Sequence, residues 1–532
     1  MVKNSQNELT HHTELRRLIL RRLGNSLLIL AGILILTFLA LHLAQQGRRG
    51  LPVTLQSAVS ETFTQVFNYL FNHPKEYVWH KEIVPAGALI IDLFSKSLGL
   101  LLVSLVAATL IGGGMGVWAA VARNKSAGPL IVAISILGVS TPSFLLGMLF
   151  WVLNVKVAGW LDMSRAPLPP TGFGWDLHLI MPALVLAARP IAQIMQVTYV
   201  SLNDVIEKDY MRLAKAKGLS ERLQLINHAL KNILIPVLTT IGTSLRFSLA
   251  SLPVVESFFL WPGLGLAILQ AFTLDMPTLI ADLIVSLGVM FLLINLTLEM
   301  AYPLIDARLR KQSVAQEDRE DESWSYGRIG SLSEWFSAVR DTVTGWFSSI
   351  FSIKKTKNTQ TPNAMDMEYA RKERKRVIKA GYSNIPLVLG SLMILGFLVL
   401  ATYGPQMTNA NPFETHNIMI IEGEVYGPPF EPSSVFPWGA DALGRDIQAL
   451  VLHGARQTLS LALFAMLARV VLGVAIGMAA GWWQNSWFDQ LINSLIGVWA
   501  AFPVTIFAVL IILSLGIERG INIFIIAFCV VG

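Results

Sequence analysis

The chain alternates between long apolar segments and shorter polar ones. A helix needs about 20 mostly apolar residues to cross a bilayer, whose hydrocarbon core is about 30 Å thick. Segments of this kind predict spans at 25–44, 97–121, 129–155, 179–200, 235–258, 279–304, 385–404, 458–481 and 488–515. A tenth apolar run begins near Ile521 and continues to Gly532, which we interpret as a span cut short in a fragment. The pattern predicts an all-α, polytopic membrane protein.

Composition supports this fold class and narrows the chemistry. Of the 532 residues, 53% are hydrophobic and 14% are charged, whereas a soluble domain carries about 25% charged residues. The single cysteine, Cys529, excludes a disulfide framework and argues against a cysteine-based metal site. The nine histidines form no clustered ligand pattern, so we predict no metal site.

The basic residues predict the orientation of the spans. With the N-terminal segment 1–24 in the cytoplasm, the polar segments on the inner side carry 28 lysines and arginines and those on the outer side carry 8. Cytoplasmic loops are enriched in these residues. Arg48 and Arg49 fall on the outer side against the trend. The first span follows the basic stretch ELRRLILRRLG, and we interpret it as an uncleaved anchor because further spans follow.

A repeat at constant spacing links the two ends of the chain. Residues 97–126 align without a gap on 458–487 after a shift of 361. The shift pairs Gly112 with Gly473, Gly116 with Gly477, Asn124 with Asn485 and Pro142 with Pro503. We interpret the repeat as an internal duplication that gives two homologous, parallel halves of about six spans each, the second incomplete.

The paired small residues and the two prolines carry different predictions. Glycines at i and i+4 favour close helix packing. Pro142 and Pro503 predict bends within spans, either beside a central pathway or as purely structural kinks, and the sequence leaves both interpretations open.

A basic stretch, which we call the elbow (residues 210–225), interrupts the apolar pattern on the cytoplasmic side. The spacing predicts a helix from about Leu202 to Lys217, ended by Gly218 in the left-handed conformation. Ser220 is suited to cap a second helix that starts at Glu221. Four apolar residues recur at helical spacing on the second helix: Leu223, Ile226, Leu230 and Ile233. The residues favour three interpretations: a solvated loop, a segment lying on anionic lipid, or a knob presented to a soluble partner.

Several motifs resemble one family of transport proteins. The stretch RLAKAKGLSERLQLINHALKNILIPV resembles the EAA loop of ABC-transporter permeases in the dipeptide, oligopeptide and nickel importer family. VVESFFLWPGLG (254–265) and YPLIDARLR (302–310) resemble its first permease type. FPWGADALGRDIQALVLHGARQTLSLAL (436–463) and WAAFPVTIFAVLI (499–511) resemble the second type. Arg212 occupies the position of the EAA glutamate, whereas Ala214 and Gly218 match, and the two permease types are usually separate chains.

The resemblance implies a function for the elbow. It implies a multi-pass permease of the cell inner membrane that imports short peptides or a related small solute such as a nickel chelate. ATPase coupling would fall on Tyr210, Arg212, Leu213, Ala214, Ala216, Lys217, Gly218, Leu219 and Ser220. No GxxxxGK[ST] phosphate loop occurs in the sequence. The resemblance implies that two separate ATPase subunits bind ATP and Mg, that an extracytoplasmic protein delivers substrate, and that this chain is neither an enzyme nor a cofactor carrier.

The resemblance and the composition together predict four regions. After residues 1–24 comes the first permease half, 25–305, with its coupling loop at 201–235. A cytoplasmic linker follows at 306–384 and contains an amphipathic stretch, 334–353, which lies on the membrane surface or packs on the protein's own inner face. The second half, 385–532, ends before its own coupling loop. Two alternatives remain open: an ion-coupled secondary transporter and a membrane-embedded scaffold.

Ionisable residues within spans are candidates for function. Those in or near the predicted spans are Arg189, Arg246, Glu256, Asp282, Glu299 and Arg469. We single out Arg246 and Glu256 for a pathway role because they share the span after the elbow. On the outer side, Leu443, Ile447, Leu450 and Val451 predict a short helix along the membrane interface.

Overall fold

The computed structural model describes residues 24, 26–43, 45–46, 55–122, 127–305, 385–421, 424–484 and 486–501. Most of these residues are helical, and the strands within these ranges form two short antiparallel hairpins. Eight helices in the described parts are long and apolar enough to cross a membrane. The predicted all-α, polytopic membrane fold is confirmed.

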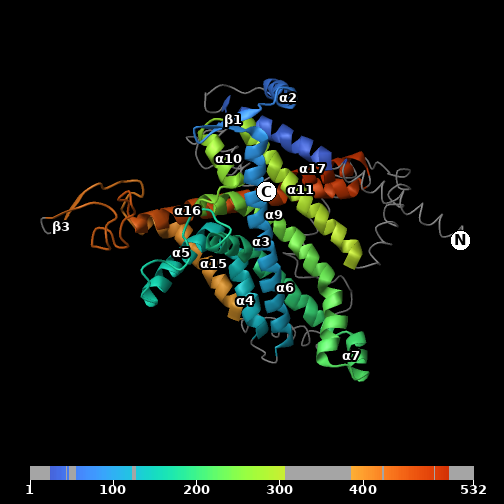
Figure 1. Cartoon of the computed structure of the whole chain (residues 1–532). Coiled ribbons are helices and arrows are strands. Elements are labelled where there is room, and N and C mark those ends of the chain that lie inside the picture. Colours follow the sequence, from blue (N-terminus) through green and yellow to red (C-terminus); the bar gives the residue numbers. More distant parts are fainter. Residues whose placement is uncertain are drawn as a thin grey trace, which may run out of the picture. The chain divides into compact units, whose positions relative to one another are not determined.

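The chain divides into two compact units, and each is described by itself. The first unit comprises residues 1–327 and 484–517. Its elements are the helix Ser26–Leu43, α2 (Leu55–Phe71), β1 (Glu76–Trp79), β2 (Glu82–Pro85), α3 (Ala86–Val121), α4 (Ala127–Ser140), α5 (Ser143–Trp160), η1 (Leu177–Leu179), α6 (Ile180–Ile206), α7 (Asp209–Ala216), α8 (Glu221–Leu223), η2 (Gln224–Leu230), α9 (Lys231–Phe259), α10 (Leu264–Thr273), α11 (Pro277–Ile305) and α17 (Trp487–Ala501) (Figure 1).

The second unit comprises residues 328–483 and 518–532. Its elements are α15 (Ile385–Tyr403), η4 (Gly404–Gln406), β3 (Met419–Ile421), β4 (Glu424–Tyr426) and α16 (Ile447–Trp482). The rings of Phe430 and Phe436 stack 5.4 Å apart at the start of the loop that leads into α16.

The short interfacial helix predicted at the start of α16 is wrong. Asp441 instead caps a turn with bonds from the backbone N–H groups of Leu443 and Arg445, Gly444 has a φ of 74°, and the helix begins only at Ile447.

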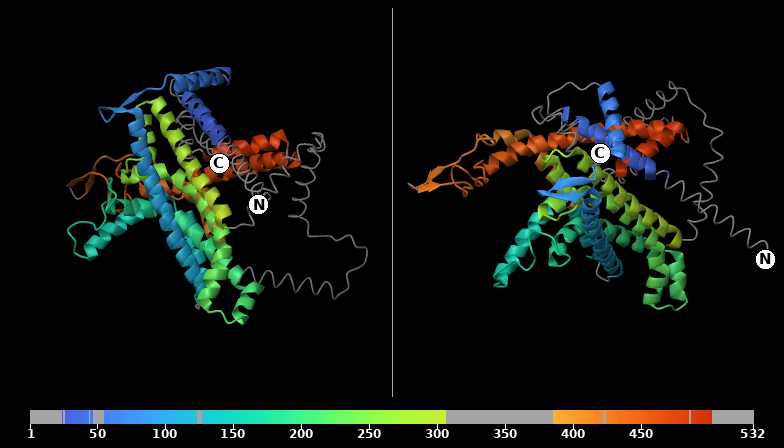
Figure 2. Two further views of the ribbon diagram at one scale, coloured as in Figure 1. Left: turned by 45° about the vertical axis from the view of Figure 1, so that its right-hand side comes forward. Right: turned by 45° about the horizontal axis from the view of Figure 1, so that its top comes forward.

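The core of the first unit is built around α6, which packs against α3, α4 and α9 (Figures 1 and 2). Gly112 and Gly116 of α3 lie directly against the α6 backbone. A Cβ at Gly112 would come within 2.7 Å of the Ile191 carbonyl oxygen, and one at Gly116 within 2.6 Å of the Met195 carbonyl oxygen. The predicted close packing is therefore confirmed for this pair. Gly473 and Gly477 of α16 meet nothing within 4 Å among the described residues.

The span predicted at 129–155 is divided into two helices. α4 ends at Ser140, and α5 begins at Ser143 after a break at Thr141 and Pro142. Proline has no N–H to donate and disfavours helical backbone in the residue before it, so the helix stops rather than bends. Pro503 lies outside the described residues, as do Cys529, the tenth apolar run and the linker segment 306–384.

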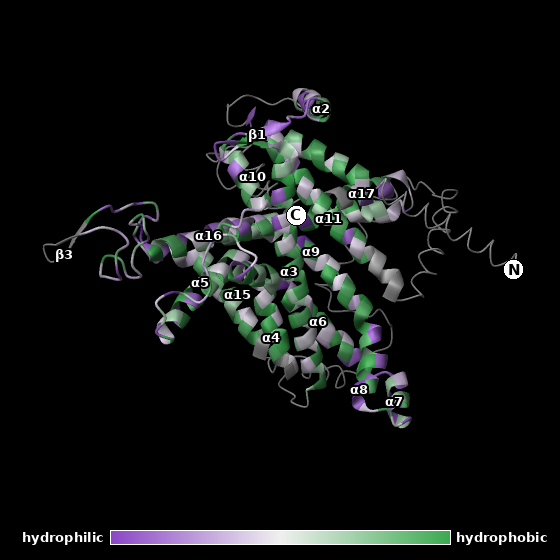
Figure 3. Ribbon diagram, viewed as in Figure 1, coloured by the Kyte–Doolittle hydropathy of each residue, from purple (hydrophilic) through white to green (hydrophobic). Residues whose placement is uncertain are grey.

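Two helices are longer than their apolar cores predict. α3 begins at Ala86 instead of residue 97, and α16 begins at Ile447 instead of residue 458. The extra turns at each N-terminus contain polar residues, which an apolar-window argument leaves out. Figure 3 shows the apolar residues along these helices and the concentration of polar residues at α7 and α8. The span predicted at 488–515 is described as far as Ala501.

Candidate functional site

The helix that precedes the elbow is interrupted before the elbow begins. α6 ends at Ile206, and a new helix, α7, starts at Asp209, so the continuous helix predicted from Leu202 to Lys217 is wrong. Lys208 interrupts it with extended backbone (φ −69°, ψ 151°). α7 is therefore a separate, short helix with its own direction, and the helical period alone gives no sign of the break.

Gly218 ends α7 as the sequence predicts. Its φ is 73°, in the left-handed region. Its N–H donates to the Lys215 carbonyl at 3.0 Å, and the N–H of Leu219 donates to the Ala214 carbonyl at 3.3 Å. This pair of bonds is the Schellman motif, in which a left-handed glycine satisfies the last carbonyls of a helix. Lys217 is the C-cap residue immediately before it.

The helix after the glycine turn starts at Glu221, as predicted, and then changes from an α-helix to a π-helix. Ser220 caps it by accepting a bond from the Leu223 N–H at 3.4 Å. After α8 the chain forms a π-helix, η2, whose wider turns rotate the helix face. The predicted apolar stripe is therefore split, because Leu223 and Ile226 are exposed whereas Ile233 is buried.

The elbow has an inner and an outer face. Met211 packs with Leu202, Ala229 and Ile233 in one buried cluster, and Ala214 is buried beside it. The outer face carries exposed apolar side chains together with exposed positive charge and one small residue: Tyr210, Arg212, Leu213, Lys215, Ala216, Lys217 and Leu223. Leu219 is half-buried between the two faces. The elbow is thus anchored to the bundle and presents a mixed apolar and basic surface outward.

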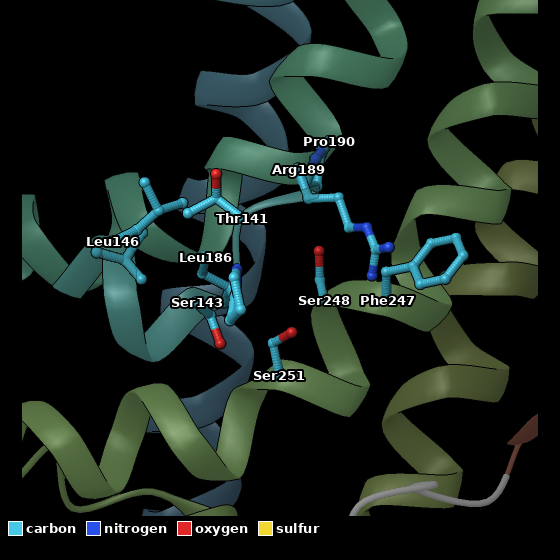
Figure 4. Close-up of a pocket in the computed structure, with 11 residues that line it drawn as sticks. Thr141, Ser143, Leu146, Leu186, Arg189, Pro190, Phe247, Ser248 and Ser251 are labelled. Carbon is cyan, nitrogen blue, oxygen red and sulfur yellow. The ribbon is translucent and has the colours of Figure 1, made fainter. Parts of the chain in front are cut away.

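A cavity of about 190 Å³ opens where α5, α6 and α9 meet. Pro142, at the break between α4 and α5, lines it, whereas Arg246 and Glu256 do not. The structure also leaves Arg246 and Glu256 apart, because Arg246 is exposed in the middle of α9 and Glu256 is buried near its C-terminal end. The cavity walls are polar and apolar side chains from three helices (Figure 4).

Glu256 holds the start of α10. It is fully buried, and its carboxylate accepts bonds from Ser97 Oγ at 2.6 Å, from the Gly265 N–H at 2.7 Å and from the Leu266 N–H at 3.1 Å. Ser97 Oγ also accepts from the Leu264 N–H at 2.7 Å. A carboxylate at a helix N-terminus satisfies free N–H groups and is favoured by the helix dipole. The VVESFFLWPGLG motif therefore links α3, α9 and α10 through hydrogen bonds.

Asp282 of α11 anchors the segment α2–β1 that precedes α3. Its carboxylate accepts bonds from the hydroxyls of Tyr69 (2.6 Å) and Tyr77 (2.8 Å), and His73 Nε2 lies 2.9 Å from it. Burial, followed by the hydrogen bond to Asp282, raises the pKa of both tyrosines well above the usual value. Sequence reasoning singled out Asp282 as an intramembrane carboxylate but missed its three partners, because they lie about 200 residues away along the chain.

Comparisons with known proteins give the family. The family described as "Binding-protein-dependent transport system inner membrane component" matches residues 112–311. The glutathione transport system permease protein GsiC of Escherichia coli (strain K12) is 36% identical over 227 residues, which cover 42% of this chain and 72% of that protein. GsiC of Salmonella paratyphi A (strain ATCC 9150 / SARB42) is 35% identical over 227 residues, which again cover 42% of this chain and 72% of that protein. This chain belongs to that family.

Membership in this permease family decides between the open alternatives. The chain is a permease component of an ABC importer and a multi-pass membrane protein, as its apolar helices also indicate. Permeases of this family are transport components and not enzymes, and they work with an ATPase and a substrate-binding protein. The ion-coupled transporter and the scaffold are therefore set aside.

Proposed function

We propose that this permease forms part of the translocation path for short peptides or a related small solute, such as a nickel chelate, and that glutathione is the first substrate to test. The relatives quoted above carry glutathione transport in their names. The motifs at 254–265 and 302–310 resemble those of the first permease type in the dipeptide, oligopeptide and nickel importer family. Separate ATPase subunits would bind ATP and Mg and hydrolyse the ATP, and an extracytoplasmic binding protein would deliver the substrate.

The elbow is the proposed coupling site, and its two-faced geometry is the observation that carries the proposal. Its inner face is fixed to the bundle through Met211 and Ala214, both buried. Its outer face exposes Tyr210 and Leu213, the latter 57% exposed. Exposed apolar side chains on a rigid helical projection favour a protein partner over water. The Schellman turn and the helix that follows it would transmit movement of an ATPase subunit into α9.

Residues 385–532 are the proposed second permease half, fused to the first by the linker. The equal length of two helices and the spacing between them support this duplication. α3 and α16 are both 36 residues long. α16 begins at Ile447, 361 residues after Ala86, and ends at Trp482, 361 residues after Val121. The helix boundaries therefore keep the spacing that the sequence repeat predicts.

Replacement of Gly218 tests the coupling role. Valine in the left-handed region costs about 1–2 kcal/mol or more, so Gly218→Val should distort the elbow. In the complex reconstituted with its ATPase and binding protein, we expect peptide uptake and substrate-stimulated ATP hydrolysis to fall about tenfold or more. Basal hydrolysis should remain.

Two control variants separate coupling from general damage. Gly87→Val alters an exposed glycine with no heavy atom within 4 Å of its Cβ position, and it should behave like the wild type. Gly218→Asn, which tolerates the left-handed conformation, should retain most coupling. Unchanged substrate stimulation in Gly218→Val would refute the coupling role of the elbow. Absence of uptake of glutathione, dipeptides and chelated nickel by the wild-type complex would refute the substrate proposal instead.

A further inference from the structure

The cavity between α5, α6 and α9 contains one cationic side chain. The lining residues are Thr141, Pro142, Ser143, Leu146, Val185, Leu186, Arg189, Pro190, Phe247, Ser248 and Ser251. None of these described lining residues is acidic. Arg189 is the positive charge among them, and hydroxyl groups stand on the surrounding walls (Figure 4). The cavity is therefore electropositive and supplies hydrogen-bond donors.

Two polar atoms at this cavity lack partners. Nε of Arg189 is buried and has no hydrogen-bond partner in the described parts of the protein, and the same holds for Oγ of Ser248. The Ser248 side chain is 1% exposed. Phe247 supports the arginine from one side, with its ring centroid 4.3 Å from the guanidinium carbon. A buried donor without a partner is costly, so this geometry is suited to a ligand that completes it.

The depth of Arg189 argues against a lipid headgroup as that ligand. Arg189 lies in the apolar segment Leu177–Ile206, twelve residues from one end and seventeen from the other. At 1.5 Å per residue, each end is about 18 Å or more away along the helix. Lipid phosphates lie beyond the hydrocarbon core, about 15 Å from its midplane. A charge near the middle of a span that faces a cavity is typical of a substrate path.

We propose that Arg189, supported by Phe247 and assisted by Ser248, binds a carboxylate of the substrate during its passage. The inference rests on the proposed peptide transport, because a peptide carries a terminal carboxylate whereas its amide bonds are neutral. A carboxylate matches the fork of N–H donors on a guanidinium. The volume of about 190 Å³ accommodates one end of a small peptide rather than the whole.

The test is uptake by the complete transporter in proteoliposomes. The probes are radiolabelled glutathione and alanyl-alanine, with vesicles of phosphatidylcholine alone or with added phosphatidylglycerol. Arg189→Gln should reduce the ratio of maximal rate to KM about tenfold or more for both peptides, mainly through KM. Ser248→Ala should cause a smaller loss of the same kind, and Arg189→Lys should restore part of it.

Matched controls make each outcome decisive. Lys156→Gln removes a positive charge from an exposed position of α5 that does not line the cavity, and it should leave uptake unchanged. Affinity of the binding protein for peptide should be the same with every variant. Suppose that the wild type takes up peptide and that KM is unchanged in Arg189→Gln and Ser248→Ala. This result would refute the carboxylate contact but not the proposed peptide transport. A loss confined to vesicles with phosphatidylglycerol would overturn it in favour of a lipid phosphate. If the wild type transports neither peptide, the proposed peptide transport fails and this contact fails with it.

Discussion

At the scale of single residues, two buried carboxylates stabilise the fold through hydrogen bonds. Their position in apolar segments of the sequence does not predict these bonds. Glu256 accepts hydrogen bonds from Ser97 and from the first turn of α10. Asp282 accepts bonds from Tyr69 and Tyr77. Both carboxylates are satisfied by hydrogen-bond donors, which is how a buried charge is tolerated, and Ser97 and the two tyrosines lie far away along the chain. Arg189, in contrast, has a buried Nε donor beside a cavity that finds no partner within the described part of the chain.

The Asp282 cluster predicts a response to alkaline pH. Folding raises the pKa of Tyr69 and Tyr77, so the folded state holds their protons more tightly than the unfolded state. The stability they contribute is fully present below a pH of about 10, the pKa of an unfolded tyrosine, and is lost as the pH rises above it. The melting temperature of the purified complex should therefore fall above that pH. A variant with Tyr69→Phe and Tyr77→Phe should lose less over the same range.

An exposed tyrosine provides the control for this experiment. Tyr403→Phe alters a side chain that is 59% exposed, and it should leave the alkaline slope of the wild type unchanged. If the variant carrying both phenylalanines declines as steeply as the wild type, the hydrogen bonds to Asp282 do not anchor the segment that precedes α3.

At the scale of elements, backbone contact decides which helices form the core. α3 lies against α6 at Gly112 and Gly116, where no side chain separates the two helices. A break at Pro142 divides one span and opens a wall of the cavity between α5, α6 and α9. In the elbow, the break before Asp209 and the π-helix after Leu223 direct the outer face away from the bundle.

The contact between α3 and α6 can be tested with neighbouring glycines. Gly112→Val places a side chain against the α6 backbone and should destabilise the folded protein by about 1–3 kcal/mol. Gly113→Val adds the same side chain where nothing lies within 4 Å, so its effect should be small. Thermal unfolding of the two purified variants provides the comparison, and equal melting temperatures would contradict the observed packing.

At the scale of the whole molecule, the first unit has two chemically different ends. α7 and α8 lie at one end of its helices, and α2 with the β1–β2 hairpin lies at the other (Figures 1 and 2). The distribution of lysine and arginine predicts that the elbow faces the cytoplasm. That arrangement would present the elbow to ATPase subunits and the hairpin to a binding protein on the outer side.

Labelling of single cysteines tests this orientation. Cys529 is the one native cysteine, so a Cys529→Ser background is free of thiols. Glu76→Cys in β1 and Lys217→Cys in the elbow both replace exposed residues. A membrane-impermeant maleimide applied to intact spheroplasts should label Glu76→Cys, and it should label Lys217→Cys only after permeabilisation. The reverse pattern would invert the predicted topology.

The sequence by itself determined the fold class, most of the spans, the glycine turn of the elbow with its serine cap, and the family. These features depend on local properties: apolar length, positive φ at a glycine, and a short motif. Only the tertiary structure decided that Ser97 donates to Glu256, that Tyr69 and Tyr77 bind Asp282, and that Arg189 lines a cavity with Ser248. Each of these contacts joins residues from different elements, and hydropathy and helical period carry no information about which faces meet when the elements pack.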